Sequence, residues 1–450
     1  MSKASLIVEC KYDSVLDFNE GMAGVILSDK INSYNETLKD RQCGFINKIG
    51  TETIPLIYSY TRSFLNNKSI VGVCGSNYNS IIQNLEHGCI DINGNVVIQF
   101  KYVYFYDFYD SIAVAYNGKN DSDHGWGCLD IFGNKIISFG KYESIGLSWF
   151  STEERDWFFG LNRFYNGNAI VRIGNRVGFI NNNGIEITPV KYDSAYCFNE
   201  GYAAVGLGEH KERKWGFLDN TGNEVISCKY DKVKSFSEGM AAVMKNSQWG
   251  FIDTTGREII PCRYNNVEYF SDGLAVIWDG KKYGFIDKTG VEIVPCKYDG
   301  VLGCREFNKN WNGFIEGMAA VYNDGMWGFI NTSGNEIIPC KYHGIGEDID
   351  VFREGFVAIR PRPDWKWGFL DKSGNEVTGF IFDDVRSFSQ GLASVRIGDY
   401  RNQKWGYINY NGDFEVPLEF DDARSYSEDM AAVKNNDKWG FINLPSKRVQ

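Results

Sequence analysis

Several features that mark enzymes, metal proteins and membrane proteins are scarce in this chain of 450 residues. Its four histidines are scattered and show neither the His-x-x-x-His nor the His-Glu-x-x-His spacing of a zinc site. No run approaches the roughly 18 consecutive apolar residues of a membrane helix. The start, MSKASLIVECKYD, has no apolar core or cleavage site of a signal peptide. We therefore expect a cytoplasmic protein without a membrane segment.

Positive charge is also in deficit. Lys plus Arg number 47 against 58 Asp plus Glu, which gives a formal net charge of −11. Nucleic acids and anionic membranes are bound through a basic surface. The charge balance therefore disfavours nucleic-acid and membrane partners.

Recognisable reaction centres are missing as well. The 49 glycines form no Gly-x-x-x-x-Gly-Lys-Ser/Thr loop, and no Gly-x-Ser-x-Gly motif presents a nucleophile. Turns such as Asp253-Thr-Thr-Gly256 supply one carboxylate each, whereas calcium takes six to eight oxygen ligands. Asn replaces the Asp at Asn331 and Asn409, as a turn former can and an anionic ligand does not readily. We expect no catalytic residue, no cofactor and no metal, and hence no enzyme.

The 11 cysteines contain no Cys-x-x-Cys pair. An odd number without that spacing disfavours both a zinc site and a disulfide framework. Eight of them recur at fixed positions of a repeat described below, which favours packed structural thiols and a reducing compartment. They are Cys10, Cys228, Cys262, Cys296 and Cys340 in one position, and Cys43, Cys89 and Cys128 in aromatic positions.

What the sequence does contain is an internal repeat. Trp249-Gly250-Phe251-Ile252-Asp253 returns 34 residues later as Tyr283-Gly284-Phe285-Ile286-Asp287. The second block is an apolar run before Lys-Tyr-Asp, as at 293–299, and the third is Glu-Gly-Met-Ala-Ala-Val, as at 238–243. Periods of 20 to 50 residues are typical of solenoids, propellers and arrays.

Each block predicts one short strand, because it is four to six residues long, rich in β-branched and aromatic types, and bounded by Gly, Pro, Asn or Asp. The first block and the apolar run are expected to form a hairpin through the Asp-x-x-Gly turn. The Glu-Gly-Met strand and the next Trp-Gly strand are expected to form a second one. The glycine of the Trp-Gly strand indicates a bulge or a close backbone approach. The fold prediction is an all-β array of about 11 antiparallel three-stranded units, stabilised by packing between neighbours.

The leading position of the first block, called the Trp slot below, can be followed along the chain. Seven of its eleven residues are Trp, and the departures are concentrated in the first third. We therefore divide the array into diverged repeats at 1–165 and regular repeats at 166–450, continuous with one another. The eleven residues are Cys43, His87, Trp126, Val177, Trp215, Trp249, Tyr283, Trp327, Trp367, Trp405 and Trp439.

The two ends of the chain are complementary in phase. It opens in the apolar-Lys-Tyr-Asp block (7–13) and stops just after the last Trp-Gly block (439–443). Either the unit begins with this strand, or the first strand pairs with the last and closes a ring. Because propellers typically have four to eight blades, we favour an open curved β-superhelix and keep the ring as the alternative.

Lys-Trp-Gly-Phe-Leu-Asp at 214–219, Trp-Gly-Phe-Ile-Asp at 249–253 and Lys-Trp-Gly-Phe-Ile-Asn at 438–443 resemble the WG-containing (KWG) repeat family, best known from bacteria. The resemblance covers nearly the whole chain. It implies a β-rich repeat protein that binds partners, and no shared catalytic residues.

Loop lengths and aromatic insertions suggest where a partner binds. The hairpin between the Ala-Val and Trp-Gly strands varies from five residues (244–248) to about 17 (26–42), and variable loops on one edge of an array often mark its binding face. Two insertions carry aromatics that the repeat does not require, and exposed Trp anchors interfaces. These candidate binding residues are Trp149, Phe150, Trp157, Phe158, Phe159 and Trp311.

The functional hypothesis is therefore a non-catalytic scaffold for an unknown protein partner, with 145–163 as the main patch. The alternative is a glycan- or small-ligand-binding array that uses the same aromatics. A third interpretation is that the insertions pack their aromatics onto the array.

Overall fold

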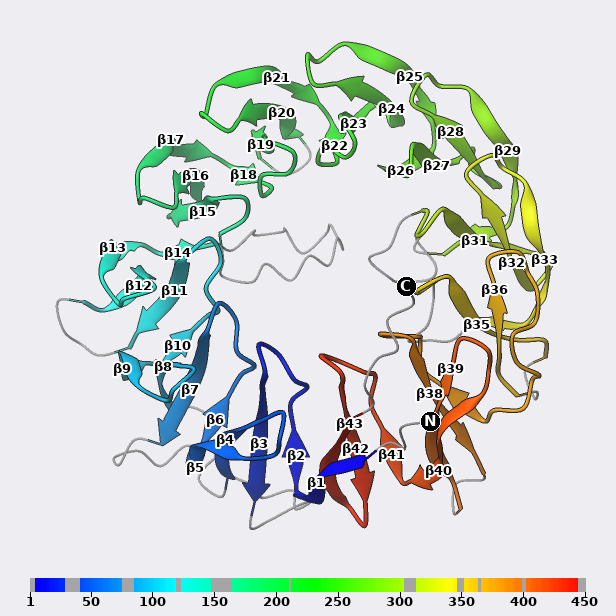
Figure 1. Cartoon of the computed structure of the whole chain (residues 1–450). Coiled ribbons are helices and arrows are strands. Elements are labelled where there is room, and N and C mark those ends of the chain that lie inside the picture. The colour runs from blue at the N-terminus through cyan, green and yellow to red at the C-terminus, as the bar shows by residue number, and fades with distance from the viewer. Residues whose placement is uncertain are drawn as a thin grey trace. The chain divides into compact units, whose positions relative to one another are not determined.

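The computed structural model describes residues 5–28, 41–74, 85–118, 123–146, 164–209, 212–302, 313–345, 352–362, 366–398 and 402–443. All named elements in these ranges are β-strands, which confirms the all-β prediction (Figure 1). Within the same ranges, no helix has the length and apolarity needed to span a membrane.

The strands form eleven antiparallel sheets within the described ranges, ten of four strands and one of three. The first five sheets contain β2 (Ser14–Val15), β3 (Met22–Ser28), β4 (Arg41–Asn47) and β5 (Glu52–Tyr58); β6 (Tyr60–Thr61), β7 (Lys68–Cys74), β8 (Leu85–Asp91) and β9 (Val96–Tyr102); β10 (Tyr104–Phe105), β11 (Ile112–Asn117), β12 (Gly125–Asp130) and β13 (Lys135–Tyr142); β14 (Ser144–Ile145), β15 (Asn168–Ile173), β16 (Arg176–Asn181) and β17 (Glu186–Tyr192); β18 (Ser194–Ala195), β19 (Tyr202–Leu207), β20 (Lys214–Asp219) and β21 (Glu224–Tyr230).

The other six contain β22 (Lys232–Val233), β23 (Met240–Lys245), β24 (Gln248–Asp253) and β25 (Glu258–Tyr264); β26 (Asn266–Ser271), β27 (Leu274–Trp278), β28 (Tyr283–Asp287) and β29 (Glu292–Tyr298); β30 (Gly300–Val301), β31 (Met318–Asn323), β32 (Met326–Asn331) and β33 (Glu336–Tyr342); β34 (Gly344–Ile345), β35 (Phe356–Arg360) and β36 (Gly368–Asp371); β37 (Asp384–Val385), β38 (Leu392–Ile397), β39 (Lys404–Asn409) and β40 (Phe414–Phe420); and β41 (Asp422–Ala423), β42 (Met430–Asn435), β43 (Lys438–Asn443) and β1 (Ser5–Tyr12).

The sheet β22–β25 shows how the repeat folds. Both predicted hairpins are present, β23 with β24 and β24 with β25. The prediction of three strands per unit was wrong by one, because Lys232 and Val233 pair with Met244 and Val243 as a fourth strand. Two residues are too few to show a periodic pattern, so the sequence gives no sign of this strand.

Burial along the strands explains their composition. In β23 and β24 four consecutive residues are buried, because these strands have protein on both faces, whereas β25 alternates buried and exposed positions. Continuous apolar runs and alternating runs are the respective signatures of such strands. Pro261 is exposed on the outer strand β25, where a missing N–H costs no pairing and protects the edge.

The Asp-x-x-Gly turn behaves as predicted. The N–H of Gly256 donates to the carbonyl of Asp253 at 2.9 Å, and the Asp253 carboxylate accepts the N–H groups of Thr255 and Arg257 at 2.9 and 3.0 Å. Gly256 has a φ of 80°, a conformation that favours glycine. The carboxylate therefore serves as a turn cap.

The glycine after the Trp slot marks a close approach, as predicted. A Cβ on Gly250 would lie 2.4 Å from the carbonyl oxygen of Ile260 on the next strand. The pairing of β24 with β25 shifts register between Trp249 and Phe251. The resulting bulge bends the outer strand across the glycine.

The core lies between neighbouring sheets. One cluster joins Trp249 and Phe251 of β24 to Val267 and Phe270 of β26, and the two Phe rings meet edge-to-face with centroids 4.8 Å apart. The sheet β22–β25 therefore buries its apolar face on the sheet β26–β29, as expected of a repeat protein.

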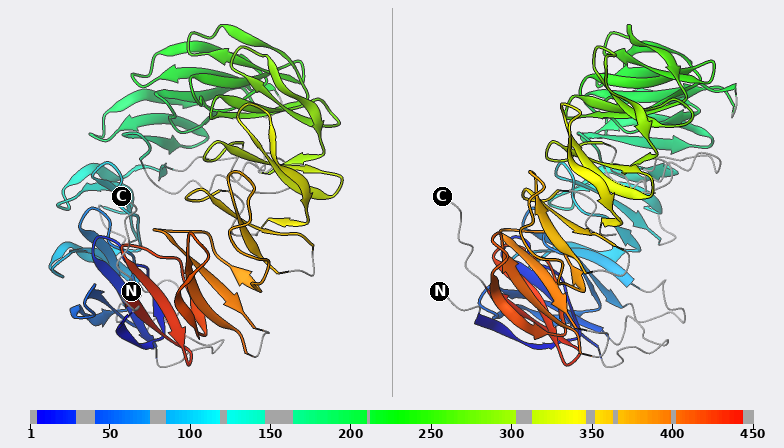
Figure 2. Two further views of the ribbon diagram at one scale, coloured as in Figure 1. Left: turned by 45° about the vertical axis from the view of Figure 1, so that its right-hand side comes forward. Right: turned by 90° about the vertical axis from the view of Figure 1, so that its right-hand side faces the viewer.

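The first strand completes the last sheet. β1 pairs with β43 through Leu6 with Ile442, Val8 with Phe441 and Tyr12 with Trp439 (Figures 1 and 2). Val8 and Tyr12 are buried in one cluster with Trp439 and Phe441. This is the terminal pairing that the ring alternative requires.

The chain comprises two compact units. One contains residues 1–100, 315–331 and 335–450, and the other contains 101–314 and 332–334. The predicted boundary near residue 165 separates diverged from regular repeats and stays a prediction.

Candidate functional site

The predicted partner-binding aromatics, Trp149, Phe150, Trp157, Phe158, Phe159 and Trp311, lie outside the described residues. The candidate surfaces are therefore built from the described strands and turns. Because successive strands run in opposite directions, the turns of every sheet lie at two opposite ends. We call the end with turns such as Asn246–Ser247 the hairpin end, and the end with turns such as Glu238–Gly239 the glutamate end.

At the glutamate end, carboxylates form hydrogen bonds between neighbouring sheets. Glu428 accepts the backbone N–H groups of Glu20 and Gly21 at 2.6 and 2.8 Å, and Glu20 in turn accepts those of Asn66 and Asn67. Glu20 and Gly21 both have positive φ, 53° and 78°, which turns their N–H groups toward the incoming carboxylate. In the same way, Glu200 accepts the N–H groups of Glu238 and Gly239, Glu316 accepts those of Glu354 and Gly355, and Glu354 accepts those of Gln390 and Gly391.

These bonds change the acidity of the carboxylate. Burial alone would raise the pKa of Glu428, but the N–H groups of Gly21 and Glu20 and the ammonium of Lys48, 3.3 Å away, outweigh it. The pKa of Glu428 is therefore lowered below its usual value. The charged form is the one that stabilises the contact.

A second set of bonds crosses at the same end. The residue before the turn at this end donates a side-chain hydrogen bond to the carbonyl of an aromatic residue in the next sheet, as Ser427 does to Phe18 at 2.9 Å. Equivalent bonds join Asn19 to Phe64, Asn199 to Phe236, Ser237 to Phe270, Ser271 to Phe314 and Ser389 to Tyr426. These bonds thus join neighbouring sheets at the glutamate end.

At the hairpin end, an Asp side chain below several of the turns accepts a Lys ammonium and a backbone N–H. Asp421 accepts the ammonium of Lys404 at 2.6 Å and the N–H of Asn436 at 2.7 Å. The Asp of Lys-Tyr-Asp follows the outer strand β40, so it joins the Lys of Lys-Trp-Gly in one sheet to the hairpin turn of the next. The same pairing joins Lys214 to Asp231, Lys282 to Asp299, Lys366 to Asp383 and, across the chain termini, Lys438 to Asp13.

Cations cover several indoles of the Trp slot. The guanidinium of Arg424 lies 4.6 Å from the ring of Trp439, and that of Arg386 lies 5.2 Å from the ring of Trp405. Lys234 lies 5.9 Å from Trp249. Such contacts are worth about 0.5–2 kcal/mol each, depending on solvation.

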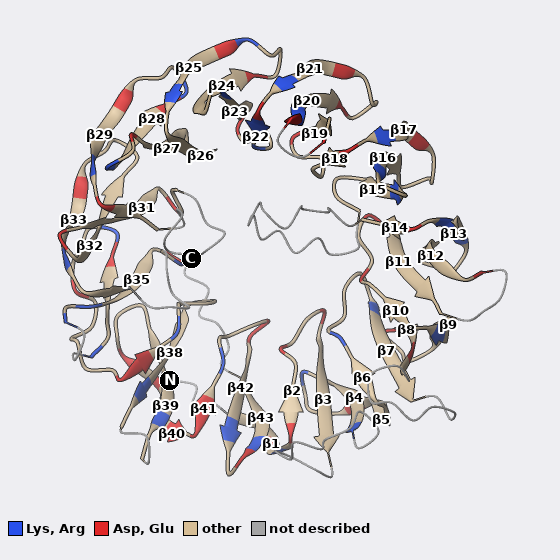
Figure 3. Ribbon diagram, turned by 180° about the vertical axis from the view of Figure 1, so that it is seen from behind, with Lys and Arg blue, Asp and Glu red and all other residues tan. Residues whose placement is uncertain are grey.

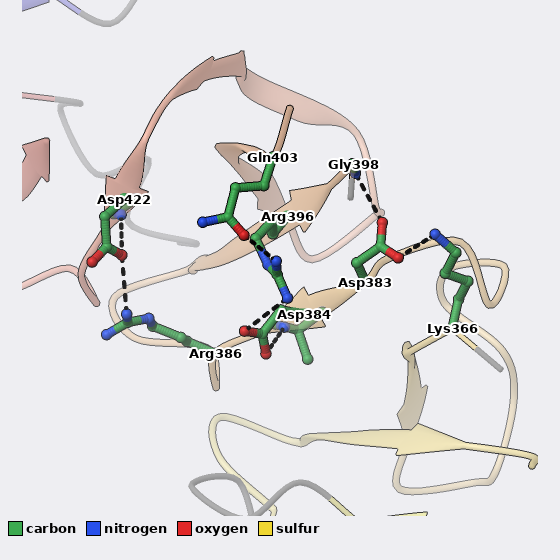
Figure 4. A network of polar contacts seen from close by, with 10 residues as sticks. Lys366, Asp383, Asp384, Arg386, Arg396, Gly398, Gln403 and Asp422 are labelled. Atoms are coloured by element: carbon green, nitrogen blue, oxygen red, sulfur yellow. Dashed lines mark hydrogen bonds and ion pairs between the residues drawn. The ribbon is translucent and has the colours of Figure 1, made fainter. Parts of the chain in front are cut away.

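The arginines also link neighbouring sheets through ion pairs. Arg386 reaches Asp422 of the next sheet at 3.2 Å, whereas Arg396 reaches Asp384 within its own sheet at 3.4 Å (Figure 4). Arg424 continues the series to Asp17 at 3.6 Å and donates to the carbonyl of Val15 at 2.9 Å. The contacts of these arginines therefore stabilise the fold.

One sheet lacks this filling. In the sheet β2–β5 the Trp slot holds Cys43, and beside it lies a hollow of about 390 Å³, lined among others by Leu16, Ile26, Arg41, Tyr60 and Arg62. Cys43 is 1% exposed, and burial raises the pKa of its thiol to about 11, so the thiol is protonated at neutral pH. From the sequence alone, Cys43 is interpreted as a packed structural thiol. The loss of a Trp there was the signal that could have indicated the hollow.

The remaining cysteines fit the packing interpretation where they are described. Cys89 and Cys128 in aromatic positions are buried. In the other position, Cys262 and Cys340 are partly buried and point their thiols at the carbonyls of Val243 and Val321. Among the described residues, no group of three or more His, Cys, Asp or Glu side chains could bind a metal ion.

Charge is mixed along the outer strands. Figure 3 shows acidic and basic residues alternating on β21, β25, β29 and β33. Each of these strands begins with Glu and has Lys or Arg next to its final Tyr. No single-sign stripe follows these four strands.

Sequence comparison finds the same repeat. A family model described as WG containing repeat matches residues 3–30, 44–73, 88–120, 178–209, 215–249, 249–282, 283–311, 327–360, 367–400 and 405–439. No curated protein matches the chain.

Solved structures show distant similarity. A crystal structure of a eukaryotic initiation factor is 10% identical with a TM-score of 0.38, covering 88% of this chain and 95% of that one. Hsv2p of Kluyveromyces lactis is 12% identical with a TM-score of 0.29, covering 62% and 94%. The tricorn protease is 10% identical with a TM-score of 0.24, covering 96% and 52%. Similarities of this size carry no functional inference.

Proposed function

Because the chain belongs to the WG-containing repeat family, we propose that it is a non-catalytic scaffold that binds a protein partner through loops at the hairpin ends of its sheets. Repeat arrays commonly bind through loops that vary on an otherwise constant frame.

The observation that carries this proposal is the contrast between constant strands and variable hairpins. Met244 pairs with Trp249 around the two-residue turn Asn246–Ser247. Ile26 pairs with Cys43 in the same way, yet twelve residues, 29–40, separate the paired Ser28 and Arg41. The pairing beneath the turn is unchanged, so the extra length is not needed to form the sheet.

The strands that flank the aromatic insertion meet at the opposite end of their sheet. β14 ends at Ile145 and β15 begins at Asn168, so the connection that contains Trp149 and Trp157 starts and finishes at the glutamate end. The predicted patch at 145–163 and the predicted loop surface are therefore two separate candidates. The proposal places the partner on the loops and treats the insertion as the second candidate surface.

The net charge of the chain and its expected location indicate which class of partner it binds. With a net charge of −11, nucleic acid and anionic membranes are poor partners. We propose a protein partner in the cytoplasm of a bacterium. The cysteines that point at backbone carbonyls support a reducing compartment.

The sequence leaves two predicted arrangements of the sheets, the open superhelix and the ring. The pairing of β1 with β43 is one that the ring requires, and the choice between the two arrangements stays a prediction.

The test compares two variants with the wild-type chain as bait in lysate. In the first, residues 29–40 are replaced by Asn-Asp, the turn found at 436–437, which fits between the paired Ser28 and Arg41. In the second, Trp149, Trp157 and Phe158 are changed to Ser. The control changes Asn436–Asp437 to Asn-Gly, a sequence suited to the same tight turn. Captured proteins are purified and their affinity for each bait is measured.

A partner that binds the wild type and the control but at least tenfold more weakly to the first variant supports the proposal. Loss from the second variant alone would move the interface to the glutamate end. Equal binding to all baits would show that neither candidate surface binds the partner. Capture of no partner, with binding on a glycan array that needs Trp149 or Trp311, would replace the scaffold by the glycan-binding alternative.

A further inference from the structure

The hollow in the sheet β2–β5 arises because four positions that are filled in regular repeats carry smaller or uncharged side chains here. The equivalence of positions follows from backbone bonds. The N–H of Leu16 donates to the carbonyl of Gly24 just as those of Lys234 and Arg424 donate to Ala242 and Ala432. Leu16 therefore stands where other sheets place the cation over the indole.

The other three positions follow in the same way. Cys43 pairs with Tyr58 as Trp249 pairs with Tyr264, so the indole is missing. Gln42 and Ser59 stand where Lys404 and Asp421 form their ion pair. Indole, cation and ion pair are thus absent together from this one site.

Neighbouring residues keep the space open. A Cβ on Gly24 would lie 2.8 Å from Cδ1 of Leu16, so glycine lets the Leu side chain lie close against the sheet. The hollow of about 390 Å³ falls in the range of small-molecule sites.

The lining has a definite charge. Two of its nine residues, Arg41 and Arg62, are basic, and none of the nine is acidic. The Nε of Arg62 donates to the hydroxyl of Tyr60 at 2.8 Å, which orients the guanidinium. A guanidinium offers five donors in a planar fork that matches a carboxylate.

From this geometry we propose that the hollow binds a flat aromatic ring that carries a carboxylate. The ring takes the place of the missing indole between Leu16, Ile26 and Cys43, and the carboxylate faces Arg41 and Arg62. Regular repeats show that the frame accepts an indole at this position, as Trp439 and Trp405 do. No bond is made or broken, because the protonated thiol of Cys43 is a poor nucleophile.

The ligand has two possible sources, a free aromatic acid or the C-terminal aromatic residue of a peptide. The first probe is indole-3-acetate, with uncharged indole-3-acetamide as its matched control. The second is a short peptide that ends in Trp, with either a free or an amidated terminus. Binding is followed by saturation-transfer NMR, since a ligand of this size binds with a Kd on the order of 1 mM or tighter.

Two variants probe the site. Cys43→Trp fills the hollow with the protein's own indole and is expected to weaken indole-3-acetate at least tenfold. Arg62→Gln is expected to weaken the acid about tenfold while changing the acetamide little, since it removes a charge-assisted contact. Arg386→Gln, at a sheet whose slot Trp405 occupies, is the control and is expected to bind like the wild type.

Equal binding of acid and amide by the wild-type protein, or no binding of either at 10 mM, on the order of ten times the expected Kd, would overturn the proposal. Unchanged binding by a folded Cys43→Trp protein would do the same. If Cys43→Trp does not fold, the acid-to-amide contrast in Arg62→Gln decides. The probe that binds more tightly, indole-3-acetate or the peptide, identifies the source of the ligand. Failure here leaves the scaffold proposal intact, because no lining residue lies in 29–40 or 145–163.

Discussion

At the scale of single residues, the Trp slot determines how fully a sheet is packed above its third strand. Where it holds Trp, as at Trp439, the indole is buried and a cation lies over it. Where it holds Cys43, a hollow remains. The same backbone therefore accepts different side chains, with consequences for packing and not for strand pairing.

Trp327→Ala is expected to destabilise the protein by about 3–5 kcal/mol, the usual cost of deleting a buried large aromatic. Trp327 is 7% exposed and contacts Tyr322 with ring centroids 4.9 Å apart. Chemical denaturation measures the change. Ile49→Ala is the control, because Ile49 is 77% exposed and its loss should stay within about 0.5 kcal/mol. Equal losses at the two positions would contradict the assignment of Trp327 to the core.

Glu428 should make stability depend on pH. Its pKa is lowered in the folded protein, so its contribution is fully present above the usual pKa of 4.5 and is lost as the pH falls through the folded pKa. Glu428→Gln is expected to cost roughly 1–2 kcal/mol at pH 7, because the N–H groups of Glu20 and Gly21 lose a charged acceptor.

Denaturation curves from pH 7 down to about pH 3, a span that brackets a carboxyl titration, test this assignment. The gap between wild type and Glu428→Gln should narrow below pH 4.5. A gap that stays constant would mean that the carboxylate's charge does not strengthen the contact. Lys48→Met separates the ion pair from the backbone bonds, and it should remove only a small part of the effect, as exposed ion pairs do.

At the scale of elements, most of the described sheets are built from two hairpins and a two-residue first strand. The hairpins follow from local chemistry, since Asp253 and Gly256 fix the turn and alternation fixes the outer strand. The first strand, such as Lys232–Val233, forms only because the neighbouring strand β23 is already in place. The bulge at Gly250 belongs to the same scale, since a Cβ would collide with the backbone of β25.

Gly440→Ala should break the pairing of β1 with β43. A Cβ on Gly440 would lie 2.3 Å from the carbonyl oxygen of Val8, and backbone cannot move aside cheaply. We expect a loss of about 1–3 kcal/mol, the usual cost of overpacking. Denaturation and amide exchange of β1 measure it.

Two glycines provide the comparison. Gly216→Ala places a Cβ 2.3 Å from the carbonyl of Ile226 inside the chain, and it should cost as much as the change at Gly440. Gly379→Ala meets its nearest neighbour at 3.5 Å and should be nearly neutral. A neutral Gly440→Ala beside a costly Gly216→Ala would show that the terminal sheet is not formed in solution.

At the scale of the whole molecule, the last sheet takes its fourth strand from the start of the chain. Asp13 pairs with Lys438, the carbonyl of Phe18 accepts from Ser427, and the N–H of Glu20 donates to Glu428, so the contacts between repeats recur between the chain termini. These contacts, β1 and β43 all belong to one compact unit.

Moving β1 to the other terminus should preserve the fold. Residues 5–12 are joined after Asn443 through Thr-Ser-Gly, the linker found at 332–334, because Ser5 pairs with Asn443 as the start of a normal hairpin would. Deletion of residues 1–12 is expected to destabilise the protein, and the rearranged chain should recover stability to within about 1 kcal/mol, as permutation at exposed ends allows. A rearranged chain no more stable than the deletion would contradict the pairing.

Residue patterns along the chain suffice to predict the repeat, the all-β class, both hairpins, the Asp-x-x-Gly turns and the close approach at the Trp-Gly glycine. These depend on residues within about one period of each other, so turn chemistry and alternation suffice to predict them. The sequence also proposed the terminal pairing, but only as an alternative.

The folded structure was needed to identify the two-residue strands, the carboxylate bonds between sheets, the pairing of β1 with β43 and the hollow beside Cys43. Glu428 and Glu20 are 408 positions apart, and nothing local predicts that their turns meet. The hollow depends on the simultaneous absence of a cation, an indole and an ion pair that come from separate strands. Packing in three dimensions brings those positions together, and a pattern read along one strand does not.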